Sequence, residues 1–239
     1  FTADDRAPTM LAIVAAPSPT EQQFILYDGA NALLTPSDIE RKYVADAPVY
    51  IYGSITLSTA ARAAATQAAI WARDAGKHVL FDVNLRPALW PDLATARTQI
   101  DAAIAAATIV KLNQDELEFV TGARDPAAGG RHLIERGVQL CCVSLGADGA
   151  FFANGAAQGH VPAPSVAVRD TTGSGDAFVA GLAMQINQTQ GDLAALGHAE
   201  LQPMLAFANA CGALAATRLG AMSALPDRVA VERLVAARA

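Results

Sequence analysis

Short apolar runs and longer segments of helical periodicity alternate along most of the chain. Four apolar runs have the length of buried strands, and they are residues 48–52, 77–83, 108–112 and 138–145. The segments between and around them predict helices at residues 59–75, 92–107, 114–121 and 130–136. Gly76 and Gly122 follow two of these segments and suit helix C-termini. Alternation of this kind predicts a parallel sheet with helices on both faces.

The two ends of the chain differ from this pattern. Two apolar runs near the start, Thr9–Ala15 and Gln23–Tyr27, predict an antiparallel pair joined by a Pro-Ser-Pro loop at 17–19. Later, strands at 150–153 and 159–161 are joined through Asn154-Gly155, a strong hairpin signal. Three helices are predicted after this hairpin, and they are residues 176–188, 201–219 and 228–237.

Composition narrows the classes of function. The 239 residues carry a net charge of −6 without a Lys/Arg block, which argues against nucleic acid or an anionic membrane as a main partner. No run of 18 apolar residues occurs, so no transmembrane helix is expected. The three cysteines lie in apolar segments and are expected to be buried free thiols, as in a cytoplasmic enzyme.

The most informative motif is Asp170-Thr171-Thr172-Gly173-Ser174-Gly175-Asp176, directly before a predicted helix. Small residues allow backbone N–H groups to approach an anion, and the helix adds the positive end of its dipole. Asp176 would lie inside this cradle, where a carboxylate can accept a hydroxyl proton. The combination indicates phosphoryl transfer, whereas a glycine turn with a capping Asp is the simpler alternative.

The run from Asp170 to Ala183 resembles the second signature of the ribokinase-like (PfkB) carbohydrate kinases. The resemblance implies that Asp176 is the catalytic base and that the N–H groups of Gly173, Ser174 and Gly175 form the anion hole. It implies an α/β fold, a ribokinase-like three-layer sandwich with a mostly parallel central sheet and a small β lid. Residues 1–46 would contain the lid strands, and residues 47–239 the ATP-binding and catalytic domain.

The resemblance also assigns nucleotide and metal residues. Asn113-Gln114-Asp115-Glu116 matches the family's N-x-x-E motif, which implies that Asn113 and Glu116 place Mg²⁺ through waters beside ATP. A helix capping box is the alternative, and the two roles are compatible. The loop Ser144–Gly149, with Gly146, resembles the nucleotide-edge loop, and Asn209 occupies an adenine-pocket position.

A monovalent cation site is implied by two further segments. The run 215–221 resembles the family's K⁺ loop, which combines with the region around Asp170 and Thr172. The candidate residues from this run are Ala215, Arg218 and Gly220. Ala224 stands where some ribokinases have a serine, so the pattern is not complete.

The run Asp82-Val83-Asn84-Leu85-Arg86-Pro87-Ala88-Leu89-Trp90 resembles the fructokinase and 2-keto-3-deoxygluconate kinase branches. Arg86 would point into the cleft and contact phosphate or an acidic sugar. The predicted reaction is therefore ATP-dependent phosphorylation of a sugar hydroxyl, with fructose preferred. Alternatives are 2-keto-3-deoxygluconate or another sugar of this family, and a non-catalytic sugar-binding regulator.

Two other enzyme classes fit the motif less well. A dinucleotide-binding oxidoreductase lacks support because Gly173-Ser174-Gly175 has no third glycine in place, and no P-loop motif occurs. The family's N-terminal Gly-Gly/Asn signature is not found, which predicts that an N-terminal third is missing. Relatives often form homodimers through the lid, so a homodimer is expected.

Overall fold

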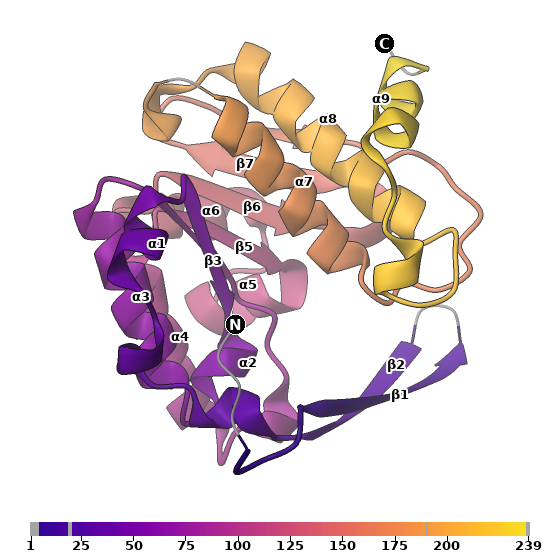
Figure 1. Cartoon of the computed structure of the whole chain (residues 1–239). Coiled ribbons are helices and arrows are strands. Elements are labelled where there is room, and N and C mark those ends of the chain that lie inside the picture. The colour runs from indigo at the N-terminus through magenta and orange to yellow at the C-terminus, as the bar shows by residue number, and fades with distance from the viewer. Residues whose placement is uncertain (1–4, 19–20, 190, 238–239) are drawn as a thin grey trace.

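In the computed structural model, which describes residues 5–18, 21–189 and 191–237, one six-stranded sheet organises most of the chain (Figure 1). Its strand order is β3-β4-β5-β6-β7-β8. Strands β3 to β6 pair in parallel, and β7 and β8 add an antiparallel edge. The strands are β3 (Val49–Gly53), β4 (His78–Asp82), β5 (Ile109–Asn113), β6 (Leu140–Ser144), β7 (Ala150–Asn154) and β8 (Gln158–Val161).

Helices cover both faces of this sheet and make it the middle of three layers (Figure 1). One layer contains α1 (Arg41–Asp46), α3 (Arg62–Asp74), α4 (Leu93–Ala106), α5 (Gln114–Thr121) and α6 (Pro126–Glu135). The other contains α7 (Ser174–Gln188) and α8 (His198–Ala215), with α9 (Arg228–Ala236) packed on α8. The short helix α2 (Ser54–Leu57) follows β3 directly.

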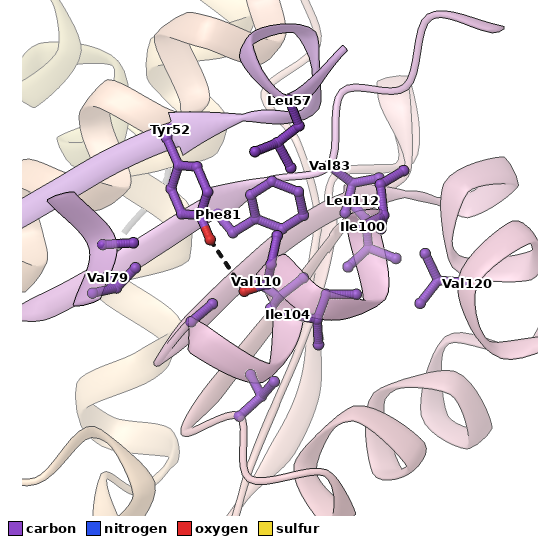
Figure 2. Packing of buried hydrophobic residues seen from close by; sticks show 14 of the residues in the cluster. Tyr52, Leu57, Val79, Phe81, Val83, Ile100, Ile104, Val110, Leu112 and Val120 are labelled. Carbon is purple, nitrogen blue, oxygen red and sulfur yellow. Dashed lines mark hydrogen bonds between the residues drawn. The ribbon is translucent and has the colours of Figure 1, made fainter. Parts of the chain in front are cut away.

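Strand alternation divides the core between the two faces. Phe81 and Val110 belong to the cluster under α3 to α6, where the Tyr52 hydroxyl donates to the Ala103 carbonyl at 3.1 Å (Figure 2). Their neighbours Leu80 and Ile109 belong to the cluster under α7 and α8. Because successive side chains point to opposite faces, Asp82 and Lys111 lie on the α7 face, two residues beyond Leu80 and Ile109.

The predicted hairpin at the start of the chain forms a separate two-stranded sheet, β1 (Leu11–Ser18) with β2 (Glu21–Tyr27). It projects from the three layers like a lid (Figure 1). The predicted loop at 17–19 is wrong in part, because Pro17 and Ser18 belong to β1, while Pro19 lies outside the described residues. The division of the chain at residue 46 stays a prediction, although α1 packs on α3.

All the predicted strands and helices form, and some boundaries and two short helices differ. The helix expected from residue 130 begins at Pro126, because the Asp125 side chain caps it by accepting from the Ala128 N–H. The helix expected to reach Leu219 ends at Ala215, where the next carbonyl, of Ala216, accepts from Arg169 and Asp170. Helices α1 and α2 were not predicted, since four to six residues carry too little periodicity.

The structure also bears on the cysteines and on membrane-spanning helices. All three cysteines are buried free thiols, as predicted. Within the described ranges, no helix combines the length and the apolar character needed to cross a bilayer.

Candidate active site

The predicted catalytic residue Asp176 lies in the first turn of α7, at the end of the helix that faces the carboxyl ends of the parallel strands. Asp176 is exposed, so a substrate can reach it. Open α/β sheets bind ligands at this edge, and the N-terminus of α7 adds positive potential there. The role of Asp176 as catalytic base stays a prediction.

The backbone before Asp176 presents unpaired donors. Gly173 caps α7 with φ +78°, a conformation that favours glycine, and an added Cβ would lie 3.1 Å from Ala221 Cα. Among the described residues, no backbone oxygen accepts from the N–H groups of Gly173 or Gly175. Ser174 differs from the expectation, because its N–H donates to the Thr171 carbonyl at 3.1 Å. Its buried hydroxyl, in contrast, has no partner within the described ranges.

A buried ion pair lies beside this turn. Lys111 Nζ is 3.1 Å from Asp82 Oδ1, and the two side chains are only 7% and 9% exposed. A Cβ added to Gly175 would lie 3.4 Å from Lys111 Nζ, which places the ammonium next to the first turn of α7. Burial raises the pKa of Asp82 to about 6, although Lys111 opposes the rise. Sequence reasoning missed this pair, and the signal was a lysine inside the apolar strand 108–112.

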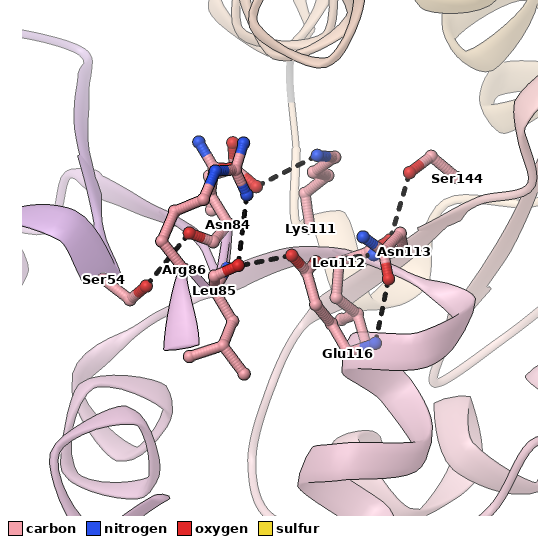
Figure 3. A network of polar contacts seen from close by, with 10 residues as sticks. Ser54, Asn84, Leu85, Arg86, Lys111, Leu112, Asn113, Glu116 and Ser144 are labelled. Atoms are coloured by element: carbon pink, nitrogen blue, oxygen red, sulfur yellow. Dashed lines mark hydrogen bonds and ion pairs between the residues drawn. The ribbon is translucent and has the colours of Figure 1, made fainter. Parts of the chain in front are cut away.

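The N-x-x-E motif forms a capping box at the start of α5 (Figure 3). Asn113 Oδ1 accepts from the Glu116 N–H at 2.8 Å, and Glu116 Oε2 accepts from the Asn113 N–H at 2.8 Å. The other carboxylate oxygen, Oε1, accepts from the Leu85 N–H at 2.9 Å. Glu116 therefore joins the motif to the loop after β4, and the capping alternative is confirmed.

That loop carries Arg86 and is held from two sides. Ser54 Oγ donates to the Asn84 carbonyl at 3.2 Å, and Glu116 accepts from Leu85 (Figure 3). Asn84 has φ +36°, a region that Asn tolerates better than most residues. Arg86 is half-buried, and its guanidinium lies on the same side of the network as the Lys111 ammonium (Figure 3). The loop thus brings a second cation to this edge of the sheet.

The predicted nucleotide-edge loop is fixed by close backbone packing. Gly149 has φ +100°, and an added Cβ would lie 2.1 Å from the Val161 carbonyl oxygen. Asn209 Nδ2 donates to that same carbonyl at 2.8 Å, in the protein interior. Ser144 Oγ donates to the Leu112 carbonyl at 3.4 Å. Asn209 therefore connects α8 to β8, and its expected contact with adenine stays a prediction.

The two segments predicted to form a monovalent cation site do lie together. Asp170 Oδ1 accepts from the Thr172 N–H at 2.9 Å, and Oδ2 accepts from the Gly220 N–H at 3.0 Å. The hydrogen bonds from Thr172 and Gly220 lower the pKa of Asp170. Arg218 donates its N–H to the Ala215 carbonyl within the same turn.

The donor set limits how a metal can bind here. No group of three or more His, Cys, Asp or Glu side chains suited to a metal occurs in the part of the chain that the structure describes. Both oxygens of Glu116 already accept a backbone N–H, so this carboxylate suits a hydrated cation held through waters. The K⁺ site expected around Asp170, Thr172 and Gly220 stays a prediction.

The comparisons with known proteins agree with this geometry. The sequence pattern described as "pfkB family carbohydrate kinase" matches residues 1–228. The chain is 37% identical over 238 residues to Fructokinase-1 of Oryza sativa subsp. japonica, covering 97% of this chain and 72% of that protein. It is 38% identical over 206 residues to the aminoimidazole riboside kinase of Salmonella typhimurium (strain LT2), covering 85% of this chain and 62% of that protein.

Solved structures of similar fold include kinases with a bound nucleotide. The fructokinase of Xylella fastidiosa with bound ATP aligns with a TM-score of 0.87 at 31% identity, covering 98% of this chain and 76% of that one. The chain therefore spans only part of the length of the relatives it matches. The family match covers nearly all of the described fold and includes the Asp176 turn, and the chain belongs to the pfkB family of carbohydrate kinases.

Proposed function

We propose that the full-length protein is a fructokinase, which transfers the γ-phosphoryl group of ATP to a hydroxyl of fructose. The similarity to Fructokinase-1 over 97% of the chain carries this proposal, together with the TM-score of 0.87 to an ATP-bound fructokinase. The unpaired N–H groups beside Asp176 also support it, because they can donate to the oxygens of a transferred phosphoryl group.

In the proposed reaction, Asp176 accepts the proton of the attacking hydroxyl. The new bond joins the sugar oxygen to the γ-phosphorus, the bond to the bridging oxygen breaks, and its electron pair leaves with ADP. The N–H groups of Gly173 and Gly175 and the hydroxyl of Ser174 donate to the phosphoryl oxygens. The Ser174 N–H is occupied by Thr171, so the predicted anion hole of three N–H groups is reduced to two, with the hydroxyl added.

Two cations complete the proposal. Asn113 and Glu116 would hold hydrated Mg²⁺, which when bound neutralises phosphate charge. The segments around Asp170, Thr172 and Gly220 would hold K⁺, since their hydrogen bonds already bring the required loops together.

Aminoimidazole riboside is a second candidate substrate, because the chain is also similar to a kinase of that compound. The aminoimidazole riboside kinase of Salmonella typhimurium (strain LT2) is 38% identical over 206 residues, although its relative in Salmonella enterica aligns with a lower TM-score, 0.75. The loop of Arg86 keeps 2-keto-3-deoxygluconate as a third candidate. A non-catalytic sugar-binding regulator is disfavoured by Asp176 and the unpaired donors beside it.

We propose further that the protein forms a homodimer through the lid and works in the cytoplasm. One face of the lid carries exposed apolar side chains, and the buried reduced cysteines suit a reducing compartment.

A coupled ADP-release assay on the full-length protein tests the activity. Fructose, aminoimidazole riboside and 2-keto-3-deoxygluconate would be compared at matched concentrations, with Mg²⁺ and with or without K⁺. Turnover on fructose at the highest kcat/KM supports the proposal. A higher kcat/KM on another sugar overturns the fructose assignment, and ATP binding without turnover on any of the three favours the regulator.

A further inference from the structure

The buried pair of Asp82 and Lys111 has no part in the reaction described so far. The two residues are direct partners in the parallel register of β4 and β5, at the carboxyl ends of both strands. Alternation along the strands directs both side chains to the face covered by α7 and α8. The pair therefore lies inside the molecule, between the sheet and the first turn of α7.

Stability does not account for this pair. Removing two charges from water costs several kcal/mol per ion, and apolar residues of similar volume are often equally stable or better. Lys111 is also badly placed with respect to α7, because a cation near a helix N-terminus faces the positive end of the dipole. Gly175, at that end, lies close enough that an added Cβ would contact Lys111 Nζ at 3.4 Å.

An anion would resolve this unfavourable arrangement. An ammonium has three N–H donors, and Asp82 is the single acceptor that Lys111 has within the described residues, at 3.1 Å. The adjacent N–H groups of Gly173 and Gly175 have no backbone acceptor there either. Ser174 Oγ, in the same turn as these two N–H groups, is a further donor without a hydrogen-bond partner in the described ranges.

Resting on the proposed function, we infer that Lys111 is a catalytic residue whose ammonium donates to the transferred phosphoryl group, and that Asp82 is the residue that positions it. The ammonium keeps its protons throughout, while the hydroxyl proton goes to Asp176 and the electron pair of the broken P–O bond goes to ADP. Charge develops on the phosphoryl and leaving oxygens as that bond breaks, and a fixed cation stabilises it.

The test compares Lys111→Met with Lys42→Met in the full-length protein. Met preserves most of the side-chain volume, and Lys42 is a matched control because its side chain is 77% exposed at the surface. Isothermal titration would give Kd for ADP and for the non-hydrolysable analogue β,γ-imido-ATP, and the coupled assay would give kcat and KM.

Lys111→Met is expected to lower kcat by about 100-fold or more, the range of one electrostatic donor. It should weaken the imido-ATP complex at least tenfold and change Kd for ADP less than threefold, because only the former has a γ-phosphoryl group. Lys42→Met should leave all these values unchanged. Equal weakening of both nucleotides, or kcat within threefold of wild type, would overturn the inference.

Two further variants separate function from folding. Asp82→Asn/Lys111→Met removes both charges of the pair and leaves neither one unpartnered, so it should fold with a Tm near wild type and still show the loss of kcat and of imido-ATP affinity. Asp82→Asn alone retains the ammonium, so it should keep a preference for imido-ATP over ADP while kcat falls about tenfold. Loss of that preference in Asp82→Asn would contradict the inference that Lys111 donates to the phosphoryl group while Asp82 only positions it.

The proposed function can fail separately from this inference. A wild-type protein that binds both nucleotides and phosphorylates none of the sugars contradicts the kinase assignment, while the two Kd values still decide whether Lys111 contacts the γ-phosphoryl group. Wild-type protein that binds neither nucleotide overturns both.

Discussion

At the scale of single residues, Asp176 is the side chain on which the proposed chemistry depends most. Asp176→Asn keeps the shape but removes the proton acceptor, so kcat should fall by about 10²–10⁴-fold, the range of general-base catalysis. The residue is exposed, so the Tm and the Kd for ATP should stay near wild type.

Asp115→Asn provides the matched control for that variant. Asp115 also lies in the first turn of a helix, and its side chain is 84% exposed. The coupled assay should show near-normal kcat for this control. If Asp176→Asn also keeps near-normal kcat, the base assignment is wrong.

Gly149 is a position where the absence of a Cβ is needed for the close packing of the nucleotide-edge loop. Gly149→Ala would need φ +100° and would place its Cβ 2.1 Å from the Val161 carbonyl oxygen, so the nucleotide-edge loop must move. We expect a loss of unfolding free energy above about 3 kcal/mol, or failure to fold. Gly76→Ala is the control, because Gly76 has φ +69° with nothing within 4 Å of an added Cβ.

Urea denaturation of both variants measures the difference. Gly76→Ala should cost only about 1–2 kcal/mol, the price of the left-handed conformation alone. Equal losses in the two variants would show that backbone strain, not the contact with Val161, makes Gly149 necessary.

At the scale of secondary-structure elements, the sequence predicted what local patterns encode. The capping residues Asn113 and Glu116 and the glycine after Thr121 defined both ends of α5. The signature turn likewise predicted the start of α7 to within two residues of Ser174. These signals are local, because each depends on a side chain that bonds the backbone of its own helix.

Features that depend on contacts between elements could not be predicted in this way. Lys111 and Asp82 are 29 residues apart in the chain, and only the register of β4 and β5 makes them partners. The Ser174 N–H was assigned to the anion hole, although the local turn directs it to Thr171. Asn209, expected at adenine, donates to the Val161 carbonyl, a bond that requires α8 to lie against β8.

The burial of Asp82 at the end of β4 also predicts how stability changes with pH. The pKa of Asp82 is about 6 in the folded protein, above the ordinary value of 3.8 for this carboxyl. The folded state therefore binds the proton more tightly, so the contribution of Asp82 to stability reaches its full value below the unfolded pKa of 3.8 and is lost as the pH rises through 6. At about 1.4 kcal/mol per pKa unit, the loss amounts to roughly 3 kcal/mol.

Asp82→Asn cannot titrate and serves as the reference for this prediction. Urea denaturation at intervals from pH 3 to pH 7 should show the wild type losing stability relative to the variant by roughly 3 kcal/mol. A constant difference between the two proteins across this range would mean that the pKa of Asp82 is not raised in the folded state.

At the scale of the whole molecule, the lid presents more apolar surface than a two-stranded sheet can bury alone. Ile13 is paired with Ile25 and Leu11 with Tyr27 across the two strands, so these four side chains share one face. They are between 46 and 56% exposed. An isolated two-stranded sheet is marginally stable in water, which favours a partner surface over this face.

The proposed homodimer supplies such a surface, because a second copy presents the same four side chains. Ile13→Lys would introduce a charge in the middle of this face and should convert the dimer to a monomer, since an unpaired charge is costly in an apolar interface. Val14→Lys is the control, because Val14 points to the opposite face of the lid and is 42% exposed. Light scattering coupled to size-exclusion chromatography gives the mass of each protein. A wild-type mass of one chain, or a dimer in Ile13→Lys, would rule out this face as the interface, whereas monomers for both variants would mean that the two faces of the lid are both buried in the dimer.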